Sequence, residues 1–238
     1  SALAGGMTVA SCVIAVSWVE AKDRRRVESA FAQYLSPELL KQAMEKPEML
    51  SLGGKRKELS VLFSDIVGFT TLSESIEAED IQALLNDYFD EMTRIVFEHR
   101  GTIDKFIGDA LMALWGDPLP CEDHALQAVR CAIAMQKRQR ELQVQWQSQG
   151  RSSFKIRIGV NSGWMTVGNM GSKRRMSYTV IGSQVNLAQR LESKAEHGGI
   201  LIGPQTYALV SGQIPTEDIG EIQVKGVSQP VRAYKVSL

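Results

Sequence analysis

Two aspartates each follow a short apolar segment and could bind a metal ion together. Asp65 ends an alternating apolar segment, and Asp109 lies in the Gly108-Asp109 turn between the apolar segments 102–107 and 110–115. Carboxylate oxygens are ligands that Mg²⁺ and Mn²⁺ prefer in proteins. Either aspartate alone would be interpreted as a turn former or as the solvated end of a strand. The metal hypothesis therefore depends on the two residues lying side by side.

Two further segments have residue types that could bind a ligand. Residues 66–71 form a glycine-containing turn that leads into a helix, where free backbone N–H groups can bind phosphate. Asn186 and Arg190 are four residues apart in a predicted helix, so they lie on one face and can reach the same ligand. An ion pair of Arg190 with a nearby acid and a turn cap at Asn186 is the alternative, and the isolated pattern favours it.

Alternating strand and helix patterns are expected to position these residues. In chain order they are a strand at 59–65, a helix at 81–96 closed by His99-Arg100-Gly101, strands at 102–107 and 110–115, a helix around 125–133 and a strand at 154–160. This β-α-β-β-α-β order predicts an α+β fold with a ferredoxin-like core, extended by later strands and helices. In that fold the first strand lies beside the hairpin, so Asp65 and Asp109 converge at one end of the sheet.

The composition is typical of a folded globular protein. The chain has 238 residues, of which 27 are basic, 27 are acidic and 44% are hydrophobic. These values exclude a disordered chain, a collagen-like repeat and a polytopic membrane protein. The neutral charge balance gives no electrostatic reason to expect a nucleic acid as partner. The three cysteines, Cys12, Cys121 and Cys131, are an odd number without C-x-x-C spacing, so we predict neither a disulfide framework nor a zinc site. A reducing compartment is therefore expected.

The first 55 residues are predicted to precede the main domain. No charged residue occurs from Ala2 to Val19, and several basic residues follow from Lys22 onward. This order is typical of the point where a membrane helix reaches the cytoplasm. Because residues 1–19 are few and only modestly apolar, a packing helix or a signal-like segment competes with a transmembrane helix. Residues 20–55 predict a helical signalling linker with a hinge at Gly53-Gly54. The chain begins with serine rather than methionine, so we expect a fragment of a longer protein.

Three motifs resemble, in order and spacing, the catalytic signatures of the class III nucleotidyl cyclases. They are Phe63-Ser64-Asp65-Ile66-Val67-Gly68-Phe69-Thr70, Lys105-Phe106-Ile107-Gly108-Asp109 and Val185-Asn186-Leu187-Ala188-Gln189-Arg190. Three separate motifs with matching intervening elements are far more specific than any one of them. The resemblance covers residues 56–238. It implies the class III cyclase fold and a homodimer whose chains pack head to tail, with active sites at their interface.

The resemblance also implies a role for each candidate residue. It implies two Mg²⁺ or Mn²⁺ ions per active site, with ligands from Asp65, Asp109 and the carbonyl oxygen of Ile66. The purine would be bound by Lys105 and Thr179 of the opposite chain. Ribose orientation and stabilisation of transition-state charge are implied for Asn186 and Arg190. The phosphates would be bound by Gly68, Phe69, Thr70 and Lys225.

Lysine at position 105 favours ATP as the substrate and cyclic AMP as the product. Lys105 can donate a hydrogen bond to adenine N1 and Thr179 can accept one from the adenine amino group, whereas guanine reverses this polarity. A guanylyl cyclase of the same fold and a non-catalytic cyclase-like dimerisation module are the alternatives, and the complete set of motif residues argues against the module. A diguanylate cyclase would be expected to have a GGDEF-type loop, which residues 107–110 lack.

Several residues outside the motifs receive no catalytic role. Trp164 stands where some relatives have a polar or basic residue, and an aromatic side chain there is expected to pack at an interface. His99, His124 and His197 are expected to be surface or capping residues rather than catalysts. The upstream segments imply a signalling protein whose sensor lies outside this fragment. We expect a cytoplasmic catalytic domain, with the full-length protein in the cell membrane if residues 1–19 span it.

Overall fold

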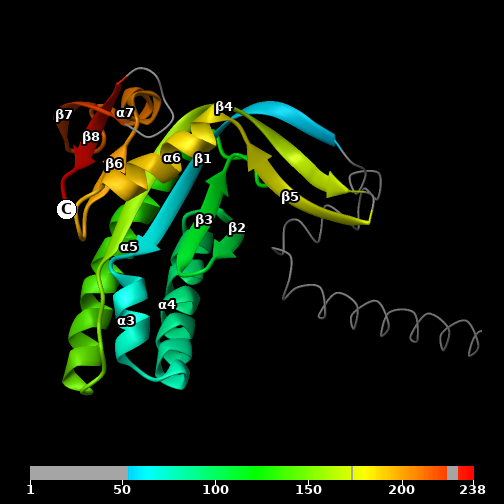
Figure 1. The fold of residues 1–238 in the computed structure, drawn as a ribbon. Helices are drawn as coiled ribbons and strands as arrows, with labels where there is room; N and C mark the ends of the chain where they lie inside the picture. The colour runs from blue at the N-terminus through cyan, green and yellow to red at the C-terminus, as the bar shows by residue number, and fades with distance from the viewer. Residues whose placement is uncertain (1–52, 173, 224–229) are drawn as a thin grey trace, which may run out of the picture. The chain divides into compact units, whose positions relative to one another are not determined.

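The structure is a computed structural model that describes residues 53–172, 174–223 and 230–238. Its elements, labelled as in Figure 1, are β1 (Gly53–Ile66), α3 (Phe69–Ser75), α4 (Ala78–Glu98), β2 (Thr102–Ile107), β3 (Ala110–Trp115), α5 (His124–Ser148), β4 (Ile156–Ser172), β5 (Arg175–Ile181), α6 (Ser183–Lys194), β6 (Ile200–Ile202), α7 (Pro204–Val210), β7 (Thr216–Ile222) and β8 (Val231–Val236). Among the described helices, none is both long enough and apolar enough to cross a membrane. The predicted segment 1–19 and residues 20–52 of the predicted linker 20–55 lie outside the described residues. The last three residues of that linker, 53–55, belong to β1 rather than to a helix.

The described strands form one eight-stranded sheet with a ferredoxin-like centre. The strand order is β2-β3-β1-β4-β6-β8-β7, and β5 pairs with β4 outside this path. The strands β2, β3, β1 and β4 are antiparallel neighbours, as the β-α-β-β-α-β order predicts. The predicted fold class is therefore confirmed for the described residues, and β6, β8 and β7 extend the sheet beyond β4.

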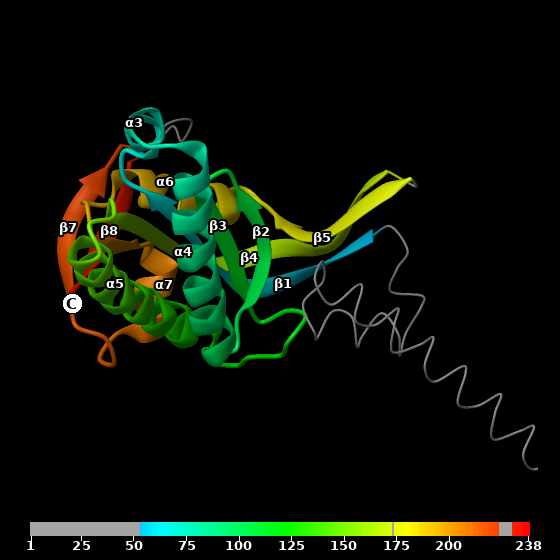
Figure 2. The same cartoon turned by 90° about the horizontal axis from the view of Figure 1, so that it is seen from below.

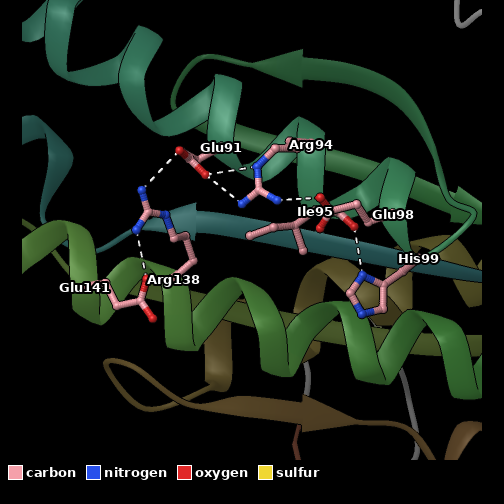
Figure 3. A network of polar contacts seen from close by, with 7 residues as sticks. All are labelled: Glu91, Arg94, Ile95, Glu98, His99, Arg138 and Glu141. Atoms are coloured by element: carbon pink, nitrogen blue, oxygen red, sulfur yellow. Dashed lines mark hydrogen bonds and ion pairs between the residues drawn. The ribbon is translucent and has the colours of Figure 1, made fainter.

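Helices α4 and α5 cover one face of the sheet (Figures 1 and 2). The buried residues of α4 recur at spacings of three, four and one, which gives the helix one apolar side: they are Leu84, Tyr88, Met92, Ile95 and Val96. This side packs on β1 and β3, where Leu62 and Leu111 are buried. At the surface between the helices, Arg138 of α5 lies 3.1 Å from Glu91 of α4 (Figure 3). Both side chains of this ion pair are half-buried, and pairs near the surface contribute about 0–1 kcal/mol, so apolar burial is the main force that holds these helices in place.

The opposite face of the sheet is covered by β5 and α6. Strand β4 has 17 residues, and its first part pairs with β6 while its distal part pairs with β5. The predicted strand at 154–160 therefore contains only the first part of β4. A second apolar cluster lies between β1, β3, β4, β5 and α6 and includes Val61, Met112, Val180 and Val185. Since both faces of β1 are covered, its central residues are buried on either side.

Two glycine predictions need correction. Gly53 and Gly54 begin β1 and pair with the distal part of β4, so they form no hinge. At the end of α4, Arg100 rather than Gly101 adopts the left-handed conformation, with a φ of 61°. Gly101 is required for a different reason, because a Cβ atom there would lie 2.6 Å from the Trp115 ring.

Candidate active site

Asp65 and Asp109 lie next to each other, as predicted. In the antiparallel pair of β1 and β3, Ser64 is opposite Leu111, so the end of β1 meets the β2–β3 turn that contains Asp109. Burial and the negative charge of Asp65 raise the pKa of Asp109. This is the behaviour expected of two carboxylates that share a site.

Arg157 of β4 neutralises part of this negative charge. Its guanidinium group lies 2.6 Å from Oδ2 of Asp65 and 3.2 Å from Oε1 of Glu192 on α6. Burial and the charge of Asp65 raise the pKa of Glu192 to about 7, although Arg157 opposes the shift. Two carboxyl groups therefore share one guanidinium, and the adjacent Asp109 adds a third carboxyl group to the region, so the local charge favours binding of a cation.

The chemistry of Asp65 and Asp109 fits a magnesium or manganese ion. Their carboxylates and the carbonyl oxygen of Ile66 are hard oxygen donors, and Mg²⁺ is usually bound by one or two carboxylates together with water and substrate phosphates. Burial and, after it, the charge of Asp65 raise the pKa of Asp109, so a cation bound beside it would favour the ionised form of its carboxyl group. Within the described ranges no group of three or more His, Cys, Asp or Glu side chains could hold a metal ion. The remaining ligands would have to come from backbone, water and substrate.

The turn after Asp65 begins with a left-handed glycine. Gly68 has a φ of 69° and caps α3, whose first residues are Phe69 and Thr70. A Cβ atom at Gly68 would meet nothing within 4 Å, so the glycine is required for its backbone conformation rather than for packing. The role of these three residues in phosphate binding stays a prediction.

Lys105 and Thr179 meet in the fold although 74 positions separate them in sequence. Nζ of Lys105, on β2, donates a hydrogen bond of 3.1 Å to Oγ1 of Thr179, on β5. A third residue, Asp104, was missed by the sequence motifs: Thr179 donates to its Oδ2 at 2.6 Å, and its Oδ1 lies 3.0 Å from Nζ of Lys105. We call these three residues the Asp104 cluster. Among the described contacts, no hydrogen bond or ion pair joins this cluster to Asp65 or Asp109.

Helix α6, which carries the predicted catalytic pair, lies directly against β4. A Cβ atom on Gly159 would be 2.2 Å from the backbone nitrogen of Glu192, so only glycine permits this approach. Near the start of the helix, Nδ2 of Asn161 donates a hydrogen bond of 3.0 Å to the backbone oxygen of Gln184. Together with the ion pair of Glu192, these contacts hold both ends of α6 on the sheet.

Asn186 and Arg190 have no polar partner among the described residues. Asn186 is exposed and Arg190 is half-buried, and neither side chain forms a hydrogen bond or an ion pair within the described part of the chain. The N-terminal cap of α6 is Gly182 rather than Asn186. The structure therefore does not support the alternative of an ion pair for Arg190 and a cap for Asn186, and both side chains are free to bind a ligand.

The other predicted residues have mixed outcomes. Lys225 lies outside the described residues. Trp164 is 57% exposed, with the guanidinium of Arg56 5.6 Å from its ring centre. His99 caps α4 as expected, but the expectation for His124 is wrong, because it is buried and its Nδ1 lies 2.8 Å from Oγ of Ser60. No sequence motif indicated that buried partner.

Comparisons with known proteins agree with the three motifs. Residues 54–237 match the family model described as the adenylate and guanylate cyclase catalytic domain. Adenylate cyclase 1 of Rhizobium meliloti is 33% identical over 208 residues, which are 87% of this chain and 31% of that protein. This chain thus spans about a third of that relative's length.

Solved structures resemble the described fold. The crystal structure of the adenylyl cyclase CyaB from P. aeruginosa has a TM-score of 0.76 and 49% sequence identity, covering 79% of this chain and 97% of that chain. The crystal structure of the guanylyl cyclase Cya2 has a TM-score of 0.72 and 38% identity, covering 78% and 94% respectively. With the family match over most of its length, this chain belongs to the class III nucleotidyl cyclases, the adenylate and guanylate cyclase catalytic domains.

Proposed function

We propose that this chain converts ATP into 3′,5′-cyclic AMP and pyrophosphate in signal transduction. The observation that carries the choice of ATP is the hydrogen bond between Lys105 and Thr179. Lys105 offers a donor and Thr179 offers an acceptor, which is the pattern complementary to adenine N1 and its amino group. The adenylate cyclase among the relatives and the adenylyl cyclase CyaB at 49% identity support the same choice.

In the proposed reaction, the ribose 3′-oxygen forms a bond to the α-phosphorus, the bond from that phosphorus to the bridging oxygen breaks, and pyrophosphate leaves. Asp65, Asp109 and the carbonyl of Ile66 would hold two Mg²⁺ or Mn²⁺ ions, which would acidify the attacking hydroxyl and neutralise the leaving group. Gly68, Phe69, Thr70 and Lys225 would bind the phosphates.

Asn186 and Arg190 would act on the reacting part of the substrate. Asn186 would orient the ribose, and Arg190 would stabilise the negative charge that grows on the α-phosphate. Loss of one such electrostatic contact commonly costs about 10²- to 10³-fold in rate. The absence of a partner for either side chain among the described residues supports these roles, because no existing contact has to be broken.

We further propose that the active form is a homodimer with its sites at the chain interface. Four large apolar side chains of β2, β4 and β5 are exposed by 46–57%, and exposed apolar side chains are frequent at interfaces: they are Phe106, Ile107, Trp164 and Ile181. In this arrangement Asp65 and Asp109 of one chain meet the Asp104 cluster, Asn186 and Arg190 of the other. Each chain then contributes to two different sites.

The organisation of the chain remains part of the proposal. Residues 53–238, which begin with β1, would form the catalytic domain, located in the cytoplasm, and residues 20–52 would be a helical signalling linker. Residues 1–19 would be the end of a transmembrane helix, with a sensor further upstream. No nucleic acid partner is proposed, because the formal net charge of the chain is zero.

Product identification tests the proposed activity. The purified chain is incubated with ATP or GTP and Mn²⁺, with a chelator as control, and the products are separated by chromatography. We expect cyclic AMP to form from ATP at a rate about 10-fold or more above that of cyclic GMP formation from GTP under the same conditions, since a mismatched base edge leaves polar groups unpaired at about 1–3 kcal/mol each. Preferential formation of cyclic GMP would identify a guanylyl cyclase. No cyclic product from a folded dimer would identify a non-catalytic module.

A further inference from the structure

A β-bulge in β2 turns Asp104 toward the candidate purine pocket. Ile103 pairs with Ala113 and Lys105 pairs with Met112, so Asp104 is an extra residue without its own partner on β3. In a regular strand, adjacent side chains point to opposite faces. The bulge removes this restriction, and Asp104 and Lys105 both contact Thr179.

The carboxylate of Asp104 balances the charge of Lys105. Its side chain is fully buried, while the side chain of Lys105 is 42% exposed and can still reach a ligand. An unpaired lysine at this position would attract phosphate, whereas an ammonium group 3.0 Å from a buried carboxylate is already compensated. The cluster therefore suits an uncharged ring edge that needs one donor and one acceptor.

Asp104 also determines which way the Thr179 hydroxyl is used. A threonine hydroxyl has one proton, and an ionised carboxylate can only accept hydrogen bonds. Because Thr179 donates its proton to Oδ2 of Asp104, its oxygen can only accept a hydrogen bond from a ligand. An adenine amino group can donate to that oxygen, but O6 of guanine cannot.

We propose that Asp104 is a positioning residue that sets purine choice by holding the Thr179 proton away from the base. This rests on the proposed function and deepens it. Asp104 need not touch the substrate, since its effect passes through Thr179. Without the carboxylate, the hydroxyl rotates and donates to guanine O6, so discrimination against GTP weakens.

The variant Asp104→Asn tests this mechanism. Lys105 draws the amide carbonyl of the new side chain toward itself, so the amide NH₂ faces Thr179 and reverses the polarity of that hydrogen bond. In the 238-residue chain, we expect the ratio of kcat/KM for ATP to that for GTP to fall about 5-fold or more. The matched control is Asp87→Asn, which removes an exposed carboxylate paired with Arg151 on a distant helix surface and should leave the ratio unchanged.

The same substitution made in a chain that carries Thr179→Val shows whether Asp104 acts through the Thr179 hydroxyl. Thr179→Val removes the hydroxyl while keeping the side-chain shape, so it should lower the ratio by itself. Adding Asp104→Asn to Thr179→Val should then change the ratio no further, because the coupled group is already gone. An equal additional fall in the Thr179→Val background would overturn the proposal.

Measurement of the wild type separates the test of the Asp104 proposal from the test of the proposed cyclase activity. Cyclic AMP formation by the wild type supports the proposed function whatever the variants do, and an unchanged ratio in Asp104→Asn then overturns the Asp104 proposal alone. If Asp104→Asn does not fold, Asp104→Ser supplies a smaller neutral group in its place. Unfolding of both variants would also count against the proposal, because it would make Asp104 a structural residue.

Discussion

The two ends of the β2–β3 hairpin differ in how completely their charges are balanced. At the Asp104 cluster, the carboxylate, the ammonium and the hydroxyl all contact one another within one chain. At the turn, Asp109 and Asp65 repel each other, and burial and the charge of Asp65 raise the pKa of Asp109. Within the described residues, Arg157 is the cation paired with Asp65. Under the proposed function, the groups that would bind the base are organised before the substrate arrives, whereas the end that would hold the phosphates still needs cations.

The largest expected effect comes from removing charge at the turn. Asp109→Asn should lower cyclase activity by about 10³-fold, because a lost metal ligand removes several kcal/mol of charge stabilisation. The thermal midpoint of the variant should not fall, since the repulsion with Asp65 disappears as well. Activity and thermal unfolding are measured on the same preparation, with Asp87→Asn as the control. Substantial residual activity in a folded Asp109→Asn chain would contradict the two-metal assignment.

A mixing experiment tests whether the two ends of the hairpin serve different sites. Inactive Asp109→Ala and Arg190→Ala chains should recover activity together, because each mixed dimer has one site with both lesions and one site with neither. Random pairing makes about half of the dimers mixed, so recovery should approach about a quarter of the wild-type rate. Differently tagged chains verify exchange of subunits. If exchange occurs without recovery, each chain must build its own complete site.

Purine preference should reverse toward GTP only when both charged residues of the Asp104 cluster are replaced together. Lys105→Glu alone places a second carboxylate beside Asp104 and should be weakly active on both nucleotides. Lys105→Glu with Asp104→Ala should shift preference toward GTP by about 10-fold, since the glutamate accepts from guanine and Thr179, with no acceptor at position 104, becomes free to donate. Steady-state rates with each nucleotide measure the shift. The same preference in the single and the double variant would mean that Asp104 does not control the hydroxyl.

The smallest expected effect concerns a buried polar cluster with no proposed contact to substrate. His124 contacts Ser60, which also contacts Ser162, and burial lowers the pKa of His124. Because the unfolded chain takes up this proton at a higher pH than the folded chain, His124 lowers stability as pH falls below its ordinary value of about 6.5. His124→Gln should therefore lose less stability than the wild type between pH 7.5 and 5.5. Thermal midpoints at both pH values measure this, and the ATP to GTP ratio should not change.

Local sequence patterns predicted the helices and strands well, but they predicted the tertiary contacts poorly. The hairpin strands have the predicted bounds because their apolar period and the Gly108-Asp109 turn depend on neighbouring residues only. The bulge that brings Asp104 to Thr179 depends on pairing with β3 and on a strand more than 70 positions away, so alternation of side chains places Asp104 on the wrong face.

The serines of β1 show that the sequence pattern also could not predict which polar side chains are buried. Apolar residues alternate with Ser60 and Ser64, which is also the pattern of a strand with one solvated face. Both serines are fully buried and are satisfied by hydrogen bonds, Ser64 to Tyr88 and Ser60 to His124. The distal half of β4 was missed for a related reason, because its pairing with β5 and with the start of β1 is tertiary.

Gly159 of β4 determines how closely α6, the helix that carries Asn186 and Arg190, approaches the sheet. The main chain of α6 rests on it, so a methyl group there would act as a wedge under the whole helix. Asn186 and Arg190 would move together by a fraction of the width of an atom, without losing any contact of their own. Displacements of about 1 Å can cost about 10²-fold in rate. Under the proposed function, a residue with no side chain would therefore affect catalysis as strongly as residues that touch the substrate, and a search for polar groups alone would overlook it.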